Sequence, residues 1–222
     1  MEALSRWNHP LLGHVSPVDF IATAERIGMI KLLTEWVLYT ACHQAVSWKN
    51  EGGPAIHMAV NISPSHFLDI DIVSLIKRII DETKMTVSEL ELEVTENVVQ
   101  TDPRNISTFR DLKDFGVDLA IDDFGTGYSS IASLKHLNVD YLKIDKCFID
   151  DMLVDDKALI LVDSMIKMGH KLGYEIIAEG VETRDQLCIL NELGCEMVQG
   201  YLFSKPVKAD QIPALLKHRF EL

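Results

Sequence analysis

Apolar residues follow two different rhythms along the chain. Short runs rich in aliphatic and β-branched residues are separated by longer segments in which apolar residues recur every three or four positions. Several of the short runs show little alternation of polar and apolar residues, which is typical of parallel strands that helices cover. The predicted strands are Ala55–Val60, Leu90–Thr95, Val117–Ile121, Tyr141–Ile144, Tyr174–Ala178 and Met197–Gln199.

The longer segments predict helices between these strands. The predicted helices are Pro17–Arg26, Lys31–Trp48, Ile72–Thr83, Pro103–Phe115, Ser130–His136, Lys157–Leu172, Arg184–Leu193 and Ala209–His218. Ser16 before Pro17 is a typical start signal, and Thr183 with Gln186 three residues later predicts a capping box. Glycine is favoured just after a helix because it readily adopts the left-handed conformation. Glycines in this position are Gly116, Gly173 and Gly194.

Repeated strand–helix–strand units predict right-handed crossovers and a parallel sheet. The number of units favours an α/β fold of the TIM-like (β/α) barrel type over an open sheet. Six full strands are predicted, and the fragment Glu2–Trp7 would end a seventh. Because a closed barrel of this type has eight strands, we expect the amino-terminal strand to be missing from this chain.

Composition narrows the class of protein. The chain has 222 residues, of which 47% are hydrophobic and 25% charged, which is typical of a single globular domain spanning residues 1–222. No apolar run reaches the roughly 20 residues that a membrane-spanning helix needs, and no signal peptide opens the chain. The net charge of −13 argues against binding of a nucleic acid polymer.

The cysteines indicate the compartment. None of the four forms a CxxC pair, which favours reduced and mostly buried thiols in a cytoplasmic protein. The domain can still belong to a longer, membrane-anchored protein.

Polar side chains stand where the predicted strands end. Because the carboxyl ends of parallel strands meet at one rim, these side chains should lie close together. They are Asn61, Glu93, Glu96, Asp122, Asp123, Lys143, Asp145, Glu179 and Gln199. Any one of them alone would be interpreted as a helix cap or a solvated loop residue. Together, however, several carboxylates at one dry rim would repel one another strongly.

Divalent cations would remove that repulsion. Carboxylate and amide oxygens, without cysteine or histidine, suit hard ions such as Mg²⁺ or Mn²⁺. The adjacent Asp122 and Asp123 can bridge two ions roughly 3.5–4 Å apart, as in two-metal phosphoryl-transfer sites. Lys143 lies inside an apolar run, where an inward lysine needs a carboxylate or phosphate partner. Gly125 and Gly127 indicate either a tight turn or a loop that shapes the site.

These motifs resemble the EAL family of cyclic di-guanylate (c-di-GMP) phosphodiesterases. The resemblance covers nearly the whole chain, and its specificity lies in the ordered set and not in Glu-Ala-Leu alone. The matching motifs are Glu2-Ala3-Leu4 with Arg6-Trp7 and His9-Pro10, Val60-Asn61, Glu91-Leu92-Glu93-Val94-Thr95-Glu96, Asp122-Asp123-Phe124-Gly125-Thr126-Gly127-Tyr128-Ser129-Ser130, Lys143-Ile144-Asp145, Ala178-Glu179-Gly180-Val181-Glu182 and Gln199-Gly200-Tyr201.

The resemblance implies a TIM-like barrel with one reversed strand, and hydrolysis of c-di-GMP to linear 5′-pGpG. It implies two Mg²⁺ or Mn²⁺ ions, inhibition by Ca²⁺, and in-line attack by a metal-bound hydroxide. The first ion would be held by Glu2, Asn61, Glu93 and Asp122, and the second by Asp122, Asp123 and Glu179. The final proton acceptor stays open between Glu179 and a relay through Asp123 and Lys143.

Other roles carried over from the family concern the surroundings of the ions. Lys143 would position the attacking water, and Arg6 would contact a substrate phosphate. Gln199 and Glu182 would line the site, and Glu96 would brace the loop after Asp123 and take part in dimer contacts. The family also implies a homodimer and an upstream sensory or GGDEF domain in the full-length protein.

Two other functions compete with this interpretation. A catalytically impaired receptor would bind c-di-GMP and signal through a partner, but it should have lost metal ligands, and none is lost here. The position of Glu2 near the chain start bears on this, because chain ends tend to fray. A barrel phosphodiesterase for other esters would leave the ordered motifs unexplained.

Overall fold

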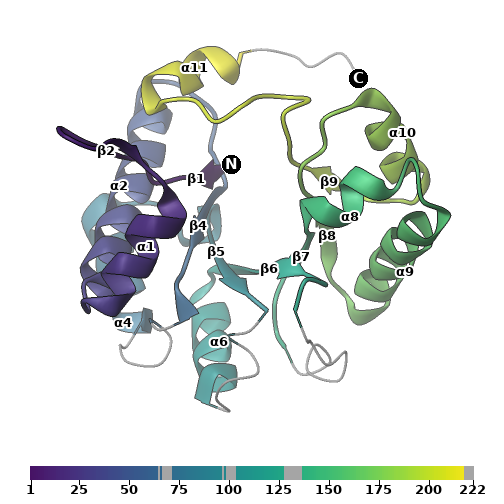
Figure 1. Cartoon of the computed structure of the whole chain (residues 1–222). Helices are drawn as coiled ribbons and strands as arrows, with labels where there is room; N and C mark the ends of the chain where they lie inside the picture. The colour runs from purple at the N-terminus through teal and green to yellow at the C-terminus, as the bar shows by residue number, and fades with distance from the viewer. Residues whose placement is uncertain (65, 67–71, 97, 99–103, 128–136, 218–222) are drawn as a thin grey trace.

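A curled sheet of seven parallel strands forms the centre of the molecule, which we describe from a computed structural model (Figure 1). The structure describes residues 1–64, 66, 72–96, 98, 104–127 and 137–217. The strands lie in the order β1-β4-β5-β6-β7-β8-β9. Their bounds are Glu2–Ala3 (β1), Met58–Asn61 (β4), Leu90–Thr95 (β5), Asp118–Phe124 (β6), Tyr141–Ile144 (β7), Glu175–Ala178 (β8) and Met197–Val198 (β9).

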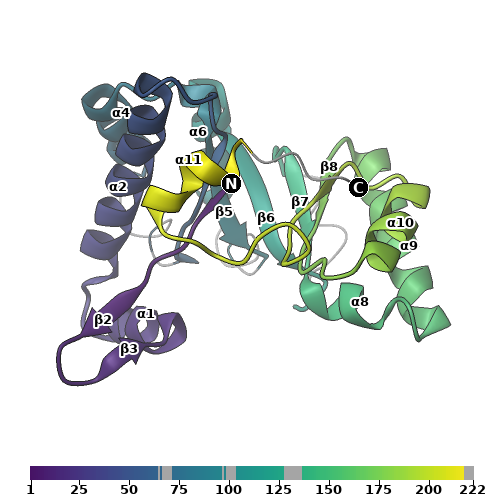
Figure 2. The same ribbon diagram turned by 90° about the horizontal axis from the view of Figure 1, so that it is seen from above.

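Helices cover the outer face of this sheet, as Figures 1 and 2 show. The α-helices are Pro17–Arg26 (α1), Ile30–Asn50 (α2), Ile72–Thr83 (α4), Arg104–Phe115 (α6), Lys146–Asp151 (α8), Asp156–Leu172 (α9), Arg184–Glu192 (α10) and Ile212–Leu215 (α11), with 3-10 turns at Val87–Glu89 and Ala209–Gln211. None of the helices in the described ranges is long and apolar enough to cross a membrane.

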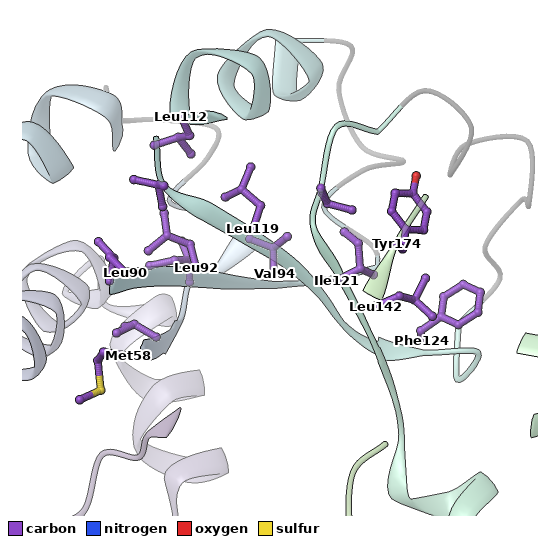
Figure 3. Close-up of a cluster of buried hydrophobic side chains, with 14 of the residues drawn as sticks. Met58, Leu90, Leu92, Val94, Leu112, Leu119, Ile121, Phe124, Leu142 and Tyr174 are labelled. Carbon is purple, nitrogen blue, oxygen red and sulfur yellow. The ribbon is translucent and has the colours of Figure 1, made fainter. Parts of the chain in front are cut away.

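One face of each strand supplies the hydrophobic core. In β5, Leu90, Leu92 and Val94 are fully buried and belong to the same cluster as helix residues such as Leu38 and Leu112. Alternate residues of the neighbouring strands join them (Figure 3). Because successive side chains of a strand point to opposite faces, the residues between them face the inside of the curl.

The inner face is polar, which the sequence prediction of little alternation did not foresee. In β5 the inner residues are Glu91 and Glu93, and both are almost completely buried. In the middle of β7 the inner residue is Lys143, with only 1% of its side chain exposed. The apolar outer residues of these strands were therefore predicted correctly. The charged residues that alternate with them line the inside of the curled sheet.

The predicted elements agree closely with the described ones. The strands at Leu90–Thr95 and Tyr141–Ile144 and the helices Pro17–Arg26 and Ile72–Thr83 have the predicted bounds. The capping box of Thr183 and Gln186 is present, and Gly116, Gly173 and Gly194 all have positive φ.

Some details of the prediction are corrected or not tested. Ser16 is the N-cap residue before Pro17, as predicted, but its side chain makes no cap hydrogen bond. The fragment Glu2–Trp7 divides into β1 and the first strand of a hairpin, β2 (Trp7–His9) with β3 (Gly13–Val15). Helix α8 was not predicted. The helix predicted at Ser130–His136 lies outside the described residues.

The curled sheet is open between its two edge strands. All six pairings within the sheet are parallel, so the reversed strand implied by the family is not among its described strands. A side-chain contact crosses the opening: Gln199 Nε2, just after β9, donates to Glu2 Oε2 at 2.7 Å. The segment after β9 then runs across to the side of β1 and α2, where α11 lies (Figures 1 and 2).

Candidate active site

The ammonium group of Lys143 is the centre of an acidic cluster inside the curl. Its Nζ atom lies 2.5 Å from Glu93 Oε1, 2.7 Å from Glu179 Oε1 and 3.3 Å from Asp122 Oδ1. These are charge contacts, and none has the angles of a regular hydrogen bond. Burial acts to lower the pKa of Lys143, but the attraction of Glu93, Asp122 and Glu179 outweighs it and raises the pKa above its ordinary value. The surrounding carboxylates therefore favour the protonated form of Lys143.

Glu93, Asn61 and Glu2 form one side of the cluster. Asn61 Nδ2, at the end of β4, donates to Glu2 Oε1 at 2.7 Å and to Glu93 Oε2 at 3.0 Å. Burial raises the pKa of Glu93 to about 8, with Lys143 opposing the rise and Glu2 adding to it. The parallel pairing of β1 with β4 and of β4 with β5 places these three residues on neighbouring strands.

Asp122, Asp123 and Glu179 form the other side. One carboxylate oxygen of each lies within 4.8 Å of the others, which is close enough for all three to bind one metal ion. Asp123 has a positive φ of 54°, an uncommon conformation for a residue other than glycine. Its backbone N–H donates to Asp122 Oδ1 at 2.9 Å. Burial raises the pKa of Glu179 to about 7, and burial with the nearby Asp122 raises the pKa of Asp123.

The cluster has far more negative than positive groups. Five carboxylates belong to it, those of Glu2, Glu93, Asp122, Asp123 and Glu179. Within the described ranges, Lys143 is the one basic side chain that an ion pair joins to them. The pKa values of Glu93 and Glu179 are raised because burial removes these carboxylates from water, which disfavours their charged form. Oxygen donors with excess negative charge fit a hard divalent cation.

The loop after β6 is held by a carboxylate. Glu96 is buried, and its Oε2 accepts a hydrogen bond from Gly125 N at 3.2 Å. Gly125 has a φ of 94°, a conformation that favours glycine. Glu96 thus contacts the backbone two residues after Asp123, as expected for a residue that braces this loop.

Some predicted residues stand apart from the cluster. Arg6 is exposed and donates to the neighbouring Ser5 carbonyl. Glu182 is also exposed, and it pairs with Lys146 Nζ at 2.8 Å instead of reaching Lys143. The carboxylate of Asp145 caps α8 by accepting from Cys147 N at 2.9 Å. Gln199, by contrast, joins the cluster through Glu2.

Sequence reasoning missed Lys146 as part of the site's surroundings. It lies next to the predicted residue Asp145, but its contact with Glu182 joins the start of α8 to the loop after β8, 36 positions along the chain. A lysine two residues after the end of β7 was the available signal.

Comparison with known proteins agrees with this geometry. The model of the EAL domain family matches residues 1–206. The chain is 40% identical over 223 residues to the cyclic di-GMP phosphodiesterase NbdA of Pseudomonas aeruginosa, covering 100% of this chain and 28% of NbdA. It is 41% identical over 222 residues to the y4lL protein of Sinorhizobium fredii, covering 100% of this chain and 26% of y4lL. The chain thus spans little more than a quarter of the length of these relatives.

A solved structure supports the fold. The PaMucR phosphodiesterase in its c-di-GMP complex superimposes with a TM-score of 0.90 and 38% sequence identity, over 95% of this chain and 86% of that one. The expected TIM-like fold and the expected family are therefore confirmed.

Proposed function

The chain belongs to the EAL domain family, and on this basis we propose that it hydrolyses one phosphodiester bond of c-di-GMP to give linear 5′-pGpG. The observation that carries the proposal is the Lys143-centred cluster, in which carboxylates from β5, β6 and the end of β8 converge on one buried cation and the β1 carboxylate joins them through Asn61. Relatives and a solved neighbour named as c-di-GMP phosphodiesterases support the substrate.

We assign two Mg²⁺ or Mn²⁺ ions to this cluster. Glu2, Asn61, Glu93 and Asp122 would hold the first, and Asp122, Asp123 and Glu179 the second. A turn of the Asn61 amide about its last torsion would present oxygen in place of nitrogen, so this side chain can serve either its present carboxylate partners or a cation. When bound, such ions lower the pKa of water and stabilise negative charge on the leaving oxygen.

The chain's own groups would position water and substrate. Lys143 is a fixed positive charge within the carboxylates and would hold the attacking water. Glu179 contacts Lys143 at 2.7 Å and lies within 4.8 Å of Asp122 and Asp123, so we assign it as the proton acceptor, with Asp123 and Lys143 as the alternative relay. Arg6 would contact a substrate phosphate, and Gln199 and Glu182 would line the site.

The wider setting is also a proposal. We infer one EAL domain over residues 1–222, in a cytoplasmic position, that pairs as a homodimer with the help of the Glu96-braced loop. The relatives are more than three times as long as this chain. That length supports a sensory or GGDEF domain in the full-length protein, and one relative, MucR, is named as a bifunctional diguanylate cyclase and phosphodiesterase.

The decisive experiment measures linear 5′-pGpG by chromatography after incubation of the protein with c-di-GMP and Mg²⁺ or Mn²⁺. We expect release of pGpG that stops on chelation and is inhibited by Ca²⁺. Binding of c-di-GMP without any release would identify the domain as a receptor instead. Release of product from unrelated phosphodiesters at an equal rate would show a less specific esterase.

A further inference from the structure

Helix α8 touches the two segments that follow the second group of carboxylates. It follows β7 directly, and Asp145 caps its first turn. Its residues contact the loop after β6, which follows Asp123, and the loop after β8, which follows Glu179. One short helix therefore connects the two segments that flank Lys143.

Phe148 is the contact to the loop after β6. A Cβ atom added to Gly125 would lie 2.8 and 2.9 Å from two ring carbons of Phe148, and 2.7 Å from the terminal methyl of Met165 in α9. The Gly125 backbone therefore lies directly against the Phe148 ring. The same backbone donates to Glu96 on its other side, so the loop is held between a carboxylate and an aromatic ring.

Lys146 is the contact to the loop after β8. A Cβ atom added to Gly180 would lie 2.6 Å from Lys146 Cβ and 2.7 Å from its Cδ, so the lysine stem covers this glycine. The ammonium group then bridges Glu182 and Asp150, each at 2.8 Å. Gly180 directly follows Glu179, and its φ of 70° also favours glycine. The lysine thus closes over the backbone next to a carboxylate of the cluster.

These contacts act against a repulsion. Asp122, Asp123 and Glu179 bring like charges within 4.8 Å, and Coulomb repulsion at this distance favours separation of the loops. Lys143 attracts Asp122 and Glu179 but forms no ion pair with Asp123 among the described contacts. Asp123 is therefore held through its backbone, which donates to Asp122 Oδ1 and continues into the Gly125 segment on which α8 lies. A site held in place before its ion arrives binds that ion more tightly.

We propose that Lys146 and Phe148 of α8 are positioning residues that hold Asp123, near the end of β6, and Glu179, just after β8, at metal-binding distance. The proposal rests on the metal assignment made for the proposed function, and it adds residues that do not touch the ions. The contacts of α8 offset part of the electrostatic repulsion between the carboxylates. Removing these contacts should therefore weaken metal binding more than it lowers the stability of the fold.

Direct Mn²⁺ binding, measured by calorimetry on the metal-free protein, tests this without any turnover. We expect roughly three- to tenfold weaker Mn²⁺ binding for Lys146→Met and for Phe148→Leu, below the effect usual for a residue that contacts a ligand directly. Lys146→Arg, which keeps both the stem and the charge, should restore binding to within about twofold. In hydrolysis assays the Mn²⁺ concentration for half-maximal rate should rise, while kcat at saturating Mn²⁺ and KM for c-di-GMP should change little.

Two matched controls separate positioning from general stability. Lys167→Met removes another exposed lysine that pairs with an aspartate four residues away, Asp163, at 2.7 Å. Phe115→Leu shortens another partly buried ring packed on the core. Both should leave Mn²⁺ affinity within about twofold. If Phe148→Leu does not fold, the three lysine variants still decide the question, because their side chains are exposed.

The outcomes keep the two proposals apart. Equal Mn²⁺ affinity in Lys146→Met, Lys146→Arg and the original protein would overturn the role of α8, as would an original protein that binds no Mn²⁺. An original protein that binds Mn²⁺ but releases no pGpG would overturn the proposed function alone.

Discussion

The two rims of the same sheet both carry clusters of charged side chains, but in different proportions. At the amino-terminal rim, His57 lies between Glu91 Oε2 at 3.2 Å and Asp118 Oδ2 at 3.0 Å. Lys113 there contacts Asp118 at 3.3 Å and Asp140 at 2.7 Å. Two basic side chains thus face three carboxylates. At the carboxyl-terminal rim the cluster has five carboxylates, and three of them pair with the ammonium group of Lys143, the one basic side chain that an ion pair joins to it within the described ranges.

This difference in charge indicates that the amino-terminal rim serves stability and the carboxyl-terminal rim serves catalysis. The amino-terminal cluster is closer to balance: each of its carboxylates has a basic partner and Asp140 also accepts from Leu119 N at 2.8 Å, with Glu91 Oε1 left as a buried oxygen without a hydrogen bond. The carboxyl-terminal cluster is left with negative charge that a bound cation would neutralise. In barrels of this type the first rim serves stability and the second serves catalysis. Substitutions that match the two rims residue by residue can test the division.

The largest difference in activity is expected between two glutamates at opposite ends of β8. Glu179 follows the end of β8, and Glu175 begins it. We expect Glu179→Gln to lower kcat by at least about 10³-fold, because it removes both a metal ligand and the proposed proton acceptor. Glu175→Gln should leave kcat within about twofold. Steady-state pGpG release measures both, with circular dichroism to confirm folding. Near-normal turnover in Glu179→Gln would remove that residue from the mechanism.

The next largest effect concerns the two lysines. Lys143→Met should destabilise the metal-free protein by roughly 3–5 kcal/mol, because it leaves buried carboxylates without their cation. Added Mn²⁺ should recover part of this loss. Lys113→Met should cost only about 1–2 kcal/mol, because its partners are more exposed, and Mn²⁺ should recover none of it.

Urea unfolding with and without Mn²⁺ measures both lysine variants. A loss of stability in Lys113→Met that Mn²⁺ also reverses would contradict the division between the rims. Without metal, a Lys143→Met variant as stable as the original protein would contradict it as well.

Metal binding itself should stabilise the folded chain. At Mn²⁺ concentrations of about 100 times the dissociation constant, the gain is about 2.7 kcal/mol for one site that the unfolded chain lacks. Asp122→Asn should remove most of this gain, because Asp122 is assigned to both ions. Asp118→Asn, four residues earlier on β6, should keep it. Thermal unfolding in a Mn²⁺ titration checks the pair, and equal shifts in both variants would place the ion elsewhere.

The fold was largely predictable because it depends on local patterns. Apolar residues marked the outer face of each strand, and glycines such as Gly116 and Gly173 marked the helix ends. Helix α8 escaped prediction because it has only six residues, of which Ile149 alone is buried. The hairpin of β2 and β3 escaped because its strands of three residues bury little apolar surface.

The site was predictable as far as strand ends determine it. Glu93, Asp122 and Glu179 follow or end neighbouring strands, and the parallel order brings them to Lys143. What strand order does not determine is where side chains on loops turn. Glu182, which is predicted to line the site, pairs with Lys146, and that contact depends on how α8 lies against the loop after β8.

The smallest effect should come from His57, and its dependence on pH identifies the amino-terminal rim. His57 faces Glu91 of β5 and Asp118 of β6, with the Tyr141 ring of β7 at 5.8 Å. The hydrogen bond to Glu91 raises the pKa of His57 most; burial opposes the rise, and the bond to Asp118 adds to it. The raised pKa means that the folded state binds the proton more tightly than the unfolded state does.

The stabilisation by His57 is therefore complete below the unfolded pKa of about 6.5 and is lost as pH rises through the higher folded value. We expect His57→Gln to cost about 0.5–1 kcal/mol at pH 6, since the ring is partly screened by solvent, and less at pH 9. Urea unfolding at both pH values measures it, with the exposed His14→Gln of β3 as the control. Mn²⁺ affinity should be unchanged in both variants. A cost that grew from pH 6 to pH 9 would contradict the predicted stabilisation by the protonated ring. A loss of Mn²⁺ binding would show that the two rims are coupled.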